Sequence, residues 1–549
     1  MTAAGAGAES ANIARHLSLM AAKRPGATAI LFPRKGAVRR MSFGELDSES
    51  GLLARGLEAA GIGRGTRTVL MVRPGPEFFA LTFALFKAGA VPVLVDPGMG
   101  MRSLGACLAE ARPQAFIGIP MAHAARVLLG WAKGTLKTWV AVGPRLAPWM
   151  RTLPELRRLG QGGSLDAVST ASDETAAILF TSGSTGAPKG AVYTHGNFTA
   201  QVDFLGRHFG IEPGEVDLPT FPLFALFGPA LGMSAVIPEM DFTRPGSVDP
   251  ENIIGPILEH GVTHMFGSPA LLDRVGRWGE ARGVKLPSLK RVVSAGAPVS
   301  PRVMERFSKL LSTGVEIHTP YGATEALPVS SISSSELLSR TRQASARGKG
   351  VCVGRPLKGV ELRVIRVTDE ALPEWSELLL SPLGEVGELL VRGPQVTREY
   401  FGRPKATALA KVRFPDGSVG HRMGDLGYLD EEGRVWFCGR KSQRLLTKNG
   451  PMDTLPCEGV FNAHPGVYRS ALVGVGVPPA QRPVLIVELE RKAEPSQALR
   501  AELLELGARF EHTRPIRDIL FHPSLPVDIR HNAKIFREKL APWAAARVG

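Results

Sequence analysis

The residues best suited to chemistry form a glycine- and hydroxyl-rich segment, Thr181-Ser-Gly-Ser-Thr-Gly-Ala-Pro-Lys-Gly190. It follows an apolar run, residues 176–180, that is typical of a buried strand. A strand that opens into such a loop presents backbone N–H groups, hydroxyls and the Lys189 ammonium at one point, which suits a phosphate-bearing ligand. The spacing differs from a Walker A loop, because Pro188 precedes Lys189. Composition alone also allows a flexible surface loop.

Four further segments carry side chains that can contact a nucleotide. Residues 294–298, Ser-Ala-Gly-Ala-Pro, follow a predicted strand, and their glycine permits close approach to a flat ring. Tyr321-Gly-Ala-Thr-Glu325 combines an aromatic face, a hydroxyl and a carboxylate. Asp425 lies in a predicted turn, and Lys534 lies close to a predicted helix. Each segment taken alone is also compatible with an ordinary turn or a solvated side chain.

Taken together and in this order, the motifs resemble the adenylate-forming superfamily, which includes acyl-CoA synthetases, luciferases and the adenylation domains of peptide synthetases. The resemblance extends over residues 12–543. It implies an enzyme that uses ATP and Mg2+ to convert a carboxylate into an acyl-adenylate. The implied fold is α/β, with a large domain of α/β subdomains plus a β-rich subdomain, followed by a small mobile α+β domain.

The resemblance also implies a role for each matching residue. The ATP phosphates are held by Thr181, Ser182, Gly183, Ser184, Thr185, Gly186 and Lys189. The adenine is lined by Gly296, Ala297 and Pro298 and packed by Tyr321, with Gly322 and Ala323 in the same cofactor site. Thr324 contacts the α-phosphate, and Glu325 is the Mg2+ ligand. Asp425 binds the ribose hydroxyls with Arg440 nearby, and Lys534 bridges the carboxylate and the phosphate. The expected catalytic residues are Lys534, Glu325, Thr324 and Lys189.

The physical chemistry agrees with these roles. A carboxylate that attacks the α-phosphorus of ATP brings two anions together, so a cation must lie between them. Lys534 and Mg2+ can supply that charge where water is scarce.

Within the superfamily, the sequence most resembles the β-lactone synthetases of bacterial long-chain olefin biosynthesis. Residues 219–227, 266–271, 421–425, 436–441 and 521–534 carry this closer resemblance. It implies adenylation of a 2-alkyl-3-hydroxy fatty acid, followed by attack of its own β-hydroxyl to close the lactone. It also implies a complex with a β-lactone decarboxylase and a reductase of the same pathway.

Several positions depart from the general superfamily pattern. Ala225 replaces a common His, Met423 replaces a common Thr, and Ser442 stands at the hinge position. An internal hydroxyl needs no pantetheine arm, so altered hinge chemistry is tolerable in a lactone-forming enzyme. Neutral drift explains these changes equally well.

Two other functions remain open from the sequence. One is a long-chain fatty acyl-CoA or acyl-carrier ligase, and the other is a non-catalytic nucleotide- or acyl-binding relative. A serine hydrolase is disfavoured, because the chain contains no Gly-x-Ser-x-Gly elbow.

The acyl pocket is expected among apolar and aromatic segments, with Phe224, Phe227 and Phe266 as its predicted lining. Plain core packing is the alternative for each of them. No residue is singled out as the base for the β-hydroxyl. His195 and His318 are candidates only because they lie near the motifs in sequence, and oxygens of the AMP phosphate are a third possibility.

The elements that must position these residues follow an α/β rhythm. Helical spacing is found at residues 10–24, 43–60 and 77–88, and apolar strands at 68–72, 91–95, 115–119 and 138–142. After residue 385 short alternating strands with turns at 416–417 and 432–433 predict an antiparallel sheet. Gly439-Arg-Lys441 predicts a border between a domain at 1–440 and a small α+β domain at 441–549. Helices are expected there at 496–512 and 534–540.

The totals restrict the class of protein. The 549 residues are 44% hydrophobic, which is typical of a folded globular chain. The net charge of +15 is spread along the chain without a dense basic block, so acidic small molecules are favoured over nucleic acid. Four scattered cysteines indicate a reducing compartment. With neither a signal peptide nor a membrane span expected, the chain is predicted to be cytoplasmic.

Overall fold

The computed structural model describes residues 10–34, 37–181, 187–222, 226–490, 493–528 and 534–548. The chain divides into two units. The first contains Met1–Phe242, Glu251–Phe266 and Pro394–Thr407, and the second contains Thr243–Pro250, Gly267–Gly393 and Ala408–Gly549. Both units are therefore discontinuous in sequence.

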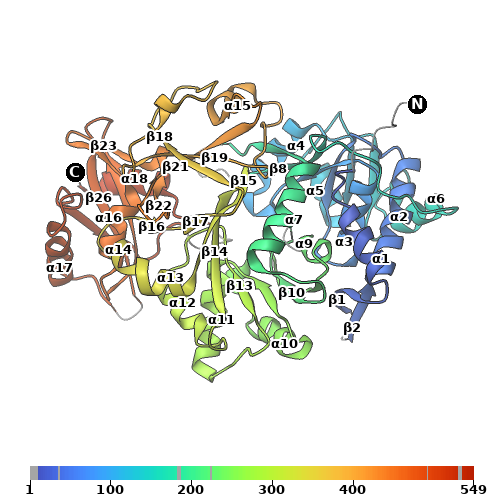
Figure 1. Ribbon diagram of the computed structural model, residues 1–549, viewed down its shortest axis with the longest axis horizontal. Helices are drawn as coiled ribbons and strands as arrows, with labels where there is room; N and C mark the ends of the chain where they lie inside the picture. Colours follow the sequence, from blue (N-terminus) through green and yellow to red (C-terminus); the bar gives the residue numbers. More distant parts are fainter. Residues whose placement is uncertain are drawn as a thin grey trace, which may run out of the picture. The chain divides into compact units, whose positions relative to one another are not determined.

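A seven-stranded sheet is the scaffold of the first unit (Figure 1), with the strand order β7-β6-β5-β3-β4-β8-β9. Neighbouring strands are parallel except for the last pair, β8 with β9. The strands are β3 (Arg67–Met71), β4 (Val91–Leu94), β5 (Ala115–Gly118), β6 (Thr138–Ala141), β7 (Arg151–Thr152), β8 (Thr175–Phe180) and β9 (Gly190–Thr194). The predicted parallel α/β organisation is confirmed.

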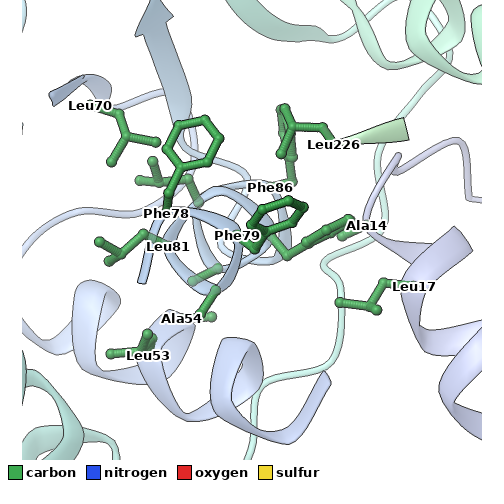
Figure 2. Close-up of a cluster of buried hydrophobic side chains, with 14 of the residues drawn as sticks. Ala14, Leu17, Leu53, Ala54, Leu70, Phe78, Phe79, Leu81, Phe86 and Leu226 are labelled. Atoms are coloured by element: carbon green, nitrogen blue, oxygen red, sulfur yellow. The ribbon is translucent and has the colours of Figure 1, made fainter. Parts of the chain in front are cut away.

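Helices cover both faces of this sheet. Successive strand residues point to opposite sides, so each face presents apolar side chains to the helices that cover it. Leu70 and Ile117 pack in the cluster that contains α2 (Phe43–Ala59) and α3 (Pro76–Lys87). Their chain neighbours Val69 and Phe116 pack in a second cluster with α4 (Met101–Ala111). Figure 2 shows the first cluster, in which α3 contributes aromatic side chains.

The helix α2 begins where the sequence predicts it. The Ser42 hydroxyl accepts a hydrogen bond from the Glu45 N–H, and the Glu45 carboxylate accepts one from the Ser42 N–H. This capping box satisfies two backbone donors that the first turn leaves without intrahelical partners.

A second group of strands in the first unit is ordered β12-β10-β11-β1-β2. Only β1 with β2 is an antiparallel pair. These strands are β1 (Thr28–Arg34), β2 (Ala37–Ser42), β10 (Val216–Pro219), β11 (Ser234–Val236) and β12 (His264–Phe266). The remaining helical segments of this unit are α1 (Arg15–Lys23), η1 (Pro97–Met99), α5 (Pro120–Leu128), α6 (Leu153–Gly160), α7 (His195–Phe209), α9 (Phe227–Ala230) and α10 (Glu251–His260).

A late segment of the chain completes the first unit. The N–H of Val192 in β9 donates to the carbonyl oxygen of Glu399, and the N–H of Phe401 donates to that of Gly190. Residues 399–401 therefore cover the outer edge of β9 with main-chain hydrogen bonds. The helix α15 (Pro404–Ala410) follows them.

The second unit contains one mixed array of strands and one antiparallel sheet. In one, β13 pairs in parallel with β14, which pairs with β15, and β15 pairs with β17. The other is a six-stranded antiparallel sheet of β16, β22, β21, β19 and β18, with β20 paired to β21. The strands are β13 (Arg291–Val293), β14 (Glu316–Ala323), β15 (Ala326–Ser333), β16 (Val351–Cys352), β17 (Arg355–Pro356), β18 (Glu361–Ile365), β19 (Gly387–Arg392), β20 (Lys411–Arg413), β21 (Val419–Leu429) and β22 (Val435–Arg440).

Helices of 3 to 14 residues lie between or beside these strands in the sequence. They are η2 (Pro245–Ser247), α11 (Pro269–Arg282), α12 (Pro301–Ser308), α13 (Ser334–Glu336), η3 (Leu337–Thr341), α14 (Arg342–Ala346), η4 (Glu377–Leu379) and η5 (Lys441–Gln443). The predicted turns at 416–417 and 432–433 do separate antiparallel strands, β20 from β21 and β21 from β22.

The last hundred residues mix strands and helices. A three-stranded sheet holds β25 (Val467–Val475), β26 (Arg482–Leu489) and β27 (Asp518–Phe521), beside the hairpin of β23 (Leu445–Thr447) and β24 (Gly450–Met452). The helices are α16 (Thr454–Asn462), α17 (Gln497–Ala508) and α18 (Arg537–Val548). The border proposed between residues 440 and 441 falls inside the second unit and stays a prediction.

Candidate active site

The glycine-rich segment of the first unit follows the strand β8, as the sequence predicts, and leads into β9. Its base is closed by a hydrogen bond of 2.9 Å from the Thr181 N–H to the Lys189 carbonyl oxygen. The Lys189 ammonium lies 5.0 Å from the centroid of the Tyr400 ring. Ser182, Gly183, Ser184, Thr185 and Gly186 lie outside the described residues.

Thr324 and Glu325 form the turn of the β14–β15 hairpin in the second unit. The pairing shifts register between Tyr321 and Ala323, which marks an irregularity at Gly322. A Cβ atom on Gly322 would lie 2.7 Å from the Ala326 carbonyl oxygen, so the backbone here leaves no space for a side chain. The hairpin thus fixes where the Thr324 hydroxyl and the Glu325 carboxylate emerge.

Asp425 is held by two side chains from different strands. The Tyr321 hydroxyl donates a 2.6 Å hydrogen bond to Asp425 Oδ2, and Arg440 Nη1 lies 2.9 Å from Asp425 Oδ1. Asp425 and Arg440 face each other in the β21–β22 register, and Tyr321 comes from β14. The carboxylate therefore has a defined orientation.

Burial dominates the electrostatics of this carboxylate. Asp425 is 3% exposed. Its desolvation raises the pKa above the usual value, although Arg440 and the Tyr321 hydrogen bond act in the opposite direction. Burial also raises the pKa of Tyr321, and the Asp425 charge adds to that rise, so this phenol is a neutral hydrogen-bond donor.

The charges of Asp425 and Arg440 both act on Lys534. Burial lowers the pKa of Lys534, Arg440 lowers it further, and Asp425 is among the carboxylates that raise it. The Lys534 N–H donates to Asp528 Oδ1 at 2.9 Å, and the Lys534 carbonyl oxygen accepts from the Asp528 N–H at 3.0 Å. This two-sided contact holds the backbone at Lys534 just before α18.

The structure adds a buried cation that the sequence did not suggest. Lys411, at the start of β20, is 6% exposed. Burial lowers its pKa to about 7, and the charge of Glu325 opposes that change. Glu325 also raises the pKa of Asp425, so its charge acts on both Lys411 and Asp425.

Glu325 is the candidate carboxylate ligand for a magnesium ion that is shared with a nucleotide. Among the described residues, no group of three or more His, Cys, Asp or Glu side chains could form a cage for a metal ion. Mg2+ commonly uses only one or two protein carboxylates and completes its shell with water and substrate phosphates. A single carboxylate at a hairpin turn is compatible with that mode of binding.

The segment assigned to the adenine follows β13. Its Ser294 N–H donates to the His318 carbonyl oxygen of β14 at 2.9 Å. Gly296 has a φ of 95° and, with Pro298, is exposed, whereas Ala297 is half-buried. β13 and β14 are parallel neighbours, and the last residues paired between them are Val293 and His318. This segment and Tyr321 both follow these residues, so both lie toward the carboxyl ends of the two strands.

The predicted acyl-pocket residues are placed differently from one another. Phe266 is buried and its ring centroid lies 6.3 Å from that of Phe221. Phe227 is half-buried, packs against the first apolar cluster and lies 6.4 Å from the ring of Phe198. Phe224 lies outside the described residues.

His195 has a structural environment. It is 1% exposed, its Nδ1 accepts a 3.3 Å hydrogen bond from the Ile13 N–H, and its ring packs against Phe86. Burial lowers its pKa to about 4. These contacts disfavour His195 as the base for a substrate hydroxyl.

The Gly384-Glu-Val-Gly-Glu-Leu389 segment has a structural role. Glu388 and Arg422 form a buried ion pair of 2.6 Å, and the Lys441 ammonium lies 3.2 Å from the same Glu388 oxygen. Arg422 also donates to carbonyl oxygens of Thr368 and Glu370. The network ties β19 to β21 and to the start of η5.

Comparison with known proteins identifies this arrangement. The family model described as AMP-binding enzyme matches residues 18–401, which include both the phosphate-loop segment and the Thr324–Glu325 hairpin. The chain belongs to the AMP-binding enzyme family. The predicted superfamily and enzyme class are confirmed, and as an adenylate-forming enzyme the chain uses ATP. Asp425, Arg440 and Lys534 lie beyond the matched range.

Full-length relatives extend the match to those residues. The chain is 51% identical to the olefin beta-lactone synthetase of Stenotrophomonas maltophilia, covering 98% of each chain. It is 50% identical to the olefin beta-lactone synthetase of Xanthomonas campestris, covering 97% of each. A 2-succinylbenzoate–CoA ligase of Geobacillus kaustophilus is 30% identical over 88% of this chain and 91% of its own.

Solved structures confirm the fold. The amide bond synthetase of Marinactinospora thermotolerans matches with a TM-score of 0.79 at 23% identity, covering 97% of this chain and 99% of that one. ATP-bound MatB of Rhodopseudomonas palustris matches with a TM-score of 0.77 at 22% identity, covering 98% and 99%. Within the described residues, no helix combines the length and apolar character that a bilayer crossing requires.

Proposed function

We propose that this protein converts a long-chain 2-alkyl-3-hydroxy fatty acid and ATP into a β-lactone, AMP and pyrophosphate. The observation that carries the proposal is the identity of 51% and 50%, over almost the whole chain, to two olefin beta-lactone synthetases. The buried Asp425 carboxylate, held by Tyr321 and Arg440, supports it, because with Lys534 it provides a fixed carboxylate and a cation in one place.

In the first step, a substrate carboxylate oxygen attacks the α-phosphorus of ATP. The bond from that phosphorus to the bridging oxygen breaks, and pyrophosphate leaves with the electron pair. We assign Lys534 to the charge that develops between carboxylate and phosphate, Lys189 to the terminal phosphates, and Thr324 to the α-phosphate. When bound at Glu325, Mg2+ would neutralise phosphate charge.

In the second step, the β-hydroxyl oxygen of the same substrate attacks the acyl carbon. A carbon–oxygen bond closes the four-membered ring, and the bond to the AMP oxygen breaks. The hydroxyl proton passes to a base, for which the leaving phosphate oxygens and His318 are the remaining candidates. Because nucleophile and electrophile belong to one molecule, this step needs no second substrate.

Further parts of the assignment extend this proposal. Asp425 binds the ribose hydroxyls, the 294–298 segment and Tyr321 contact the adenine, and Phe227 and Phe266 contribute to the acyl pocket. Residues 441–549 form a lid that carries Lys534. The protein works in the cytoplasm, in company with a β-lactone decarboxylase and a reductase.

The decisive experiment is product analysis with and without CoA. Purified enzyme is given ATP, Mg2+ and a 2-alkyl-3-hydroxy acid, and the products are identified by mass spectrometry. We expect β-lactone and AMP in the absence of CoA. If AMP and a thioester form only when CoA or a carrier protein is present, the chain is an acyl ligase and the lactone proposal is wrong. If no pyrophosphate is released under any condition, a binding role without catalysis is indicated.

A further inference from the structure

An unusual apolar face lies on α5 of the first unit. Met121 and Leu128 are 65% and 83% exposed. They are seven residues apart, so they lie on one side of the helix, about 10 Å from each other along its axis. His123 faces the opposite side, where it is buried and its ring packs against Phe116. The outward stripe of α5 therefore has the character of an interior face.

The loop after β6 carries two further exposed apolar side chains. Leu146 is 54% exposed and Trp149 is 70% exposed. The loop begins beside the start of α5, because a Cβ atom on Gly143 would lie 3.4 Å from the Pro120 side chain. The strands that lead into α5 and into the loop, β5 and β6, are parallel neighbours. We call Met121, Val127, Leu128, Leu146 and Trp149 the α5 apolar surface.

Positive charge accompanies this surface. Residues 111–154 contain no Asp or Glu. Their Lys and Arg residues are Arg112, Arg126, Lys133, Lys137, Arg145 and Arg151. All of these except Arg126 are exposed. Glu155, the next carboxylate along the chain, forms a 2.5 Å ion pair with Arg145.

A second exposed apolar segment has the opposite charge. Leu378 and Leu383 are 82% and 69% exposed in the second unit. Residues 369–385 around them contain five Asp and Glu residues and no Lys or Arg. The chain therefore provides a natural control in which similar apolar exposure is combined with negative charge.

We propose that the α5 apolar surface docks this protein onto an anionic phospholipid bilayer. Tryptophan and large aliphatic side chains are stabilised in the interfacial region of a bilayer, and each nearby Lys or Arg adds electrostatic attraction to an anionic surface. A second copy of the chain is a poorer occupant, because two chains of charge +15 would bring basic surfaces together. The inference does not depend on the proposed reaction, although a long-chain substrate would partition into the same bilayer.

Vesicle flotation tests the proposal with the full-length protein. The probes are vesicles of phosphatidylcholine alone and of phosphatidylcholine mixed with an equal amount of phosphatidylglycerol. We expect binding to the mixed vesicles, little binding to phosphatidylcholine, and release at high salt. Binding should be accompanied by a blue shift of tryptophan fluorescence that is absent in Trp149→Phe.

The double variant Leu128→Ser/Trp149→Ser should bind mixed vesicles at least about tenfold more weakly. The matched control Leu378→Ser/Leu383→Ser should bind like the wild type. The charge variant Lys133→Gln/Lys137→Gln/Arg151→Gln should bind more weakly and with less dependence on salt. Circular dichroism and thermal unfolding verify that each variant is folded.

Three outcomes would overturn the proposal. The wild type could fail to bind mixed vesicles, or both double variants could lose binding equally. Alternatively, sedimentation could show a wild-type dimer that Leu128→Ser/Trp149→Ser dissociates, without vesicle binding, which would assign the surface to a second copy. Adenylation of detergent-solubilised substrate, measured separately, should be unchanged in this variant. A failed lactone assay would therefore leave the docking result intact.

Discussion

Four side chains of the second unit show how individual residues prepare a charged site. Tyr321 and Arg440 occupy different oxygens of the Asp425 carboxylate, and Lys534 lies in the same electrostatic environment. Burial lowers the pKa of Lys534 and raises that of Asp425. Burial therefore disfavours the charged form of both groups. An anionic ligand would stabilise the Lys534 ammonium, and hydroxyl donors would stabilise the Asp425 carboxylate.

Replacing Lys534 by Ala should reduce the rate of adenylation by about 100-fold or more, because a cation is lost where two anions meet. ATP affinity should change little. The measurements are single-turnover formation of acyl-adenylate and calorimetric ATP binding. Lys539→Ala, an exposed change in α18, is the control and should behave like the wild type. Unchanged single-turnover adenylation in Lys534→Ala would refute the assigned role.

His195 should make stability depend on pH. Its pKa is about 4 in the folded chain and about 6.5 when unfolded, so the unfolded state binds more protons between these values. The stability contribution is complete above pH 6.5 and is lost as the pH falls towards 4. Between pH 7 and pH 5 the loss should be about 2 kcal/mol.

The variant His195→Asn isolates this effect, because it retains an acceptor near the Ile13 N–H and cannot titrate. Free energies of unfolding are measured with denaturant at pH 7 and pH 5 for both proteins. The free energy of unfolding of the wild type, relative to that of His195→Asn, should be about 2 kcal/mol lower at pH 5 than at pH 7. A difference that is independent of pH would contradict the assignment.

At the scale of elements, the β14–β15 hairpin depends on Gly322. A methyl group there would approach the Ala326 carbonyl oxygen to 2.7 Å and shift the turn that carries Thr324 and Glu325. Gly322→Ala should therefore lower kcat/KM for ATP by tenfold to about a hundredfold.

Gly255→Ala is the matched control, because nothing lies within 4 Å of its Cβ position in α10. That change should leave activity intact and stabilise the helix by about 0.5–1 kcal/mol. Steady-state kinetics and thermal unfolding of both variants test the comparison. Full activity in Gly322→Ala would show that the hairpin can move without consequence.

Local patterns predict the elements well where hydrophobic spacing decides them. The helix expected at 77–88 is α3, and the strand expected at 91–95 is β4, within a residue at each end. The helix expected from residue 10 begins only at Arg15. The Asn12 amide donates to carbonyl oxygens of Phe86 and Val168, and such distant contacts leave no local signal.

The end of the chain was predicted less well for a similar reason. A helix was expected at 534–540, but α18 begins at Arg537, and Ile535 instead bridges to Val527. The neighbour relation of Asp425 and Arg440 could be predicted, because a turn at 432–433 folds them opposite each other. The Tyr321 hydrogen bond to Asp425 and the burial of Lys411 could not, since both depend on how separate segments pack.

At the scale of the whole molecule, the cysteine thiols should be unreactive in the native protein. All four cysteines are buried and free. Burial raises the pKa of Cys107 and Cys352 to about 11, so few thiolates are present at neutral pH. The native protein should react slowly with Ellman's reagent and release four thiols only after unfolding. A thiol that reacts within seconds in the native protein would contradict this expectation.

The return of residues 399–401 to the outer edge of β9 bears on how the protein is made. A ribosome that adds 5–20 residues per second needs on the order of 20 seconds to proceed from Lys189 to Tyr400. Throughout that interval the nascent chain exposes a strand edge whose native cover has not been synthesised. Until the later segment emerges, the unpaired edge of β9 can form hydrogen bonds with strands of other chains. Chaperones would therefore be expected to bind the nascent chain during this interval.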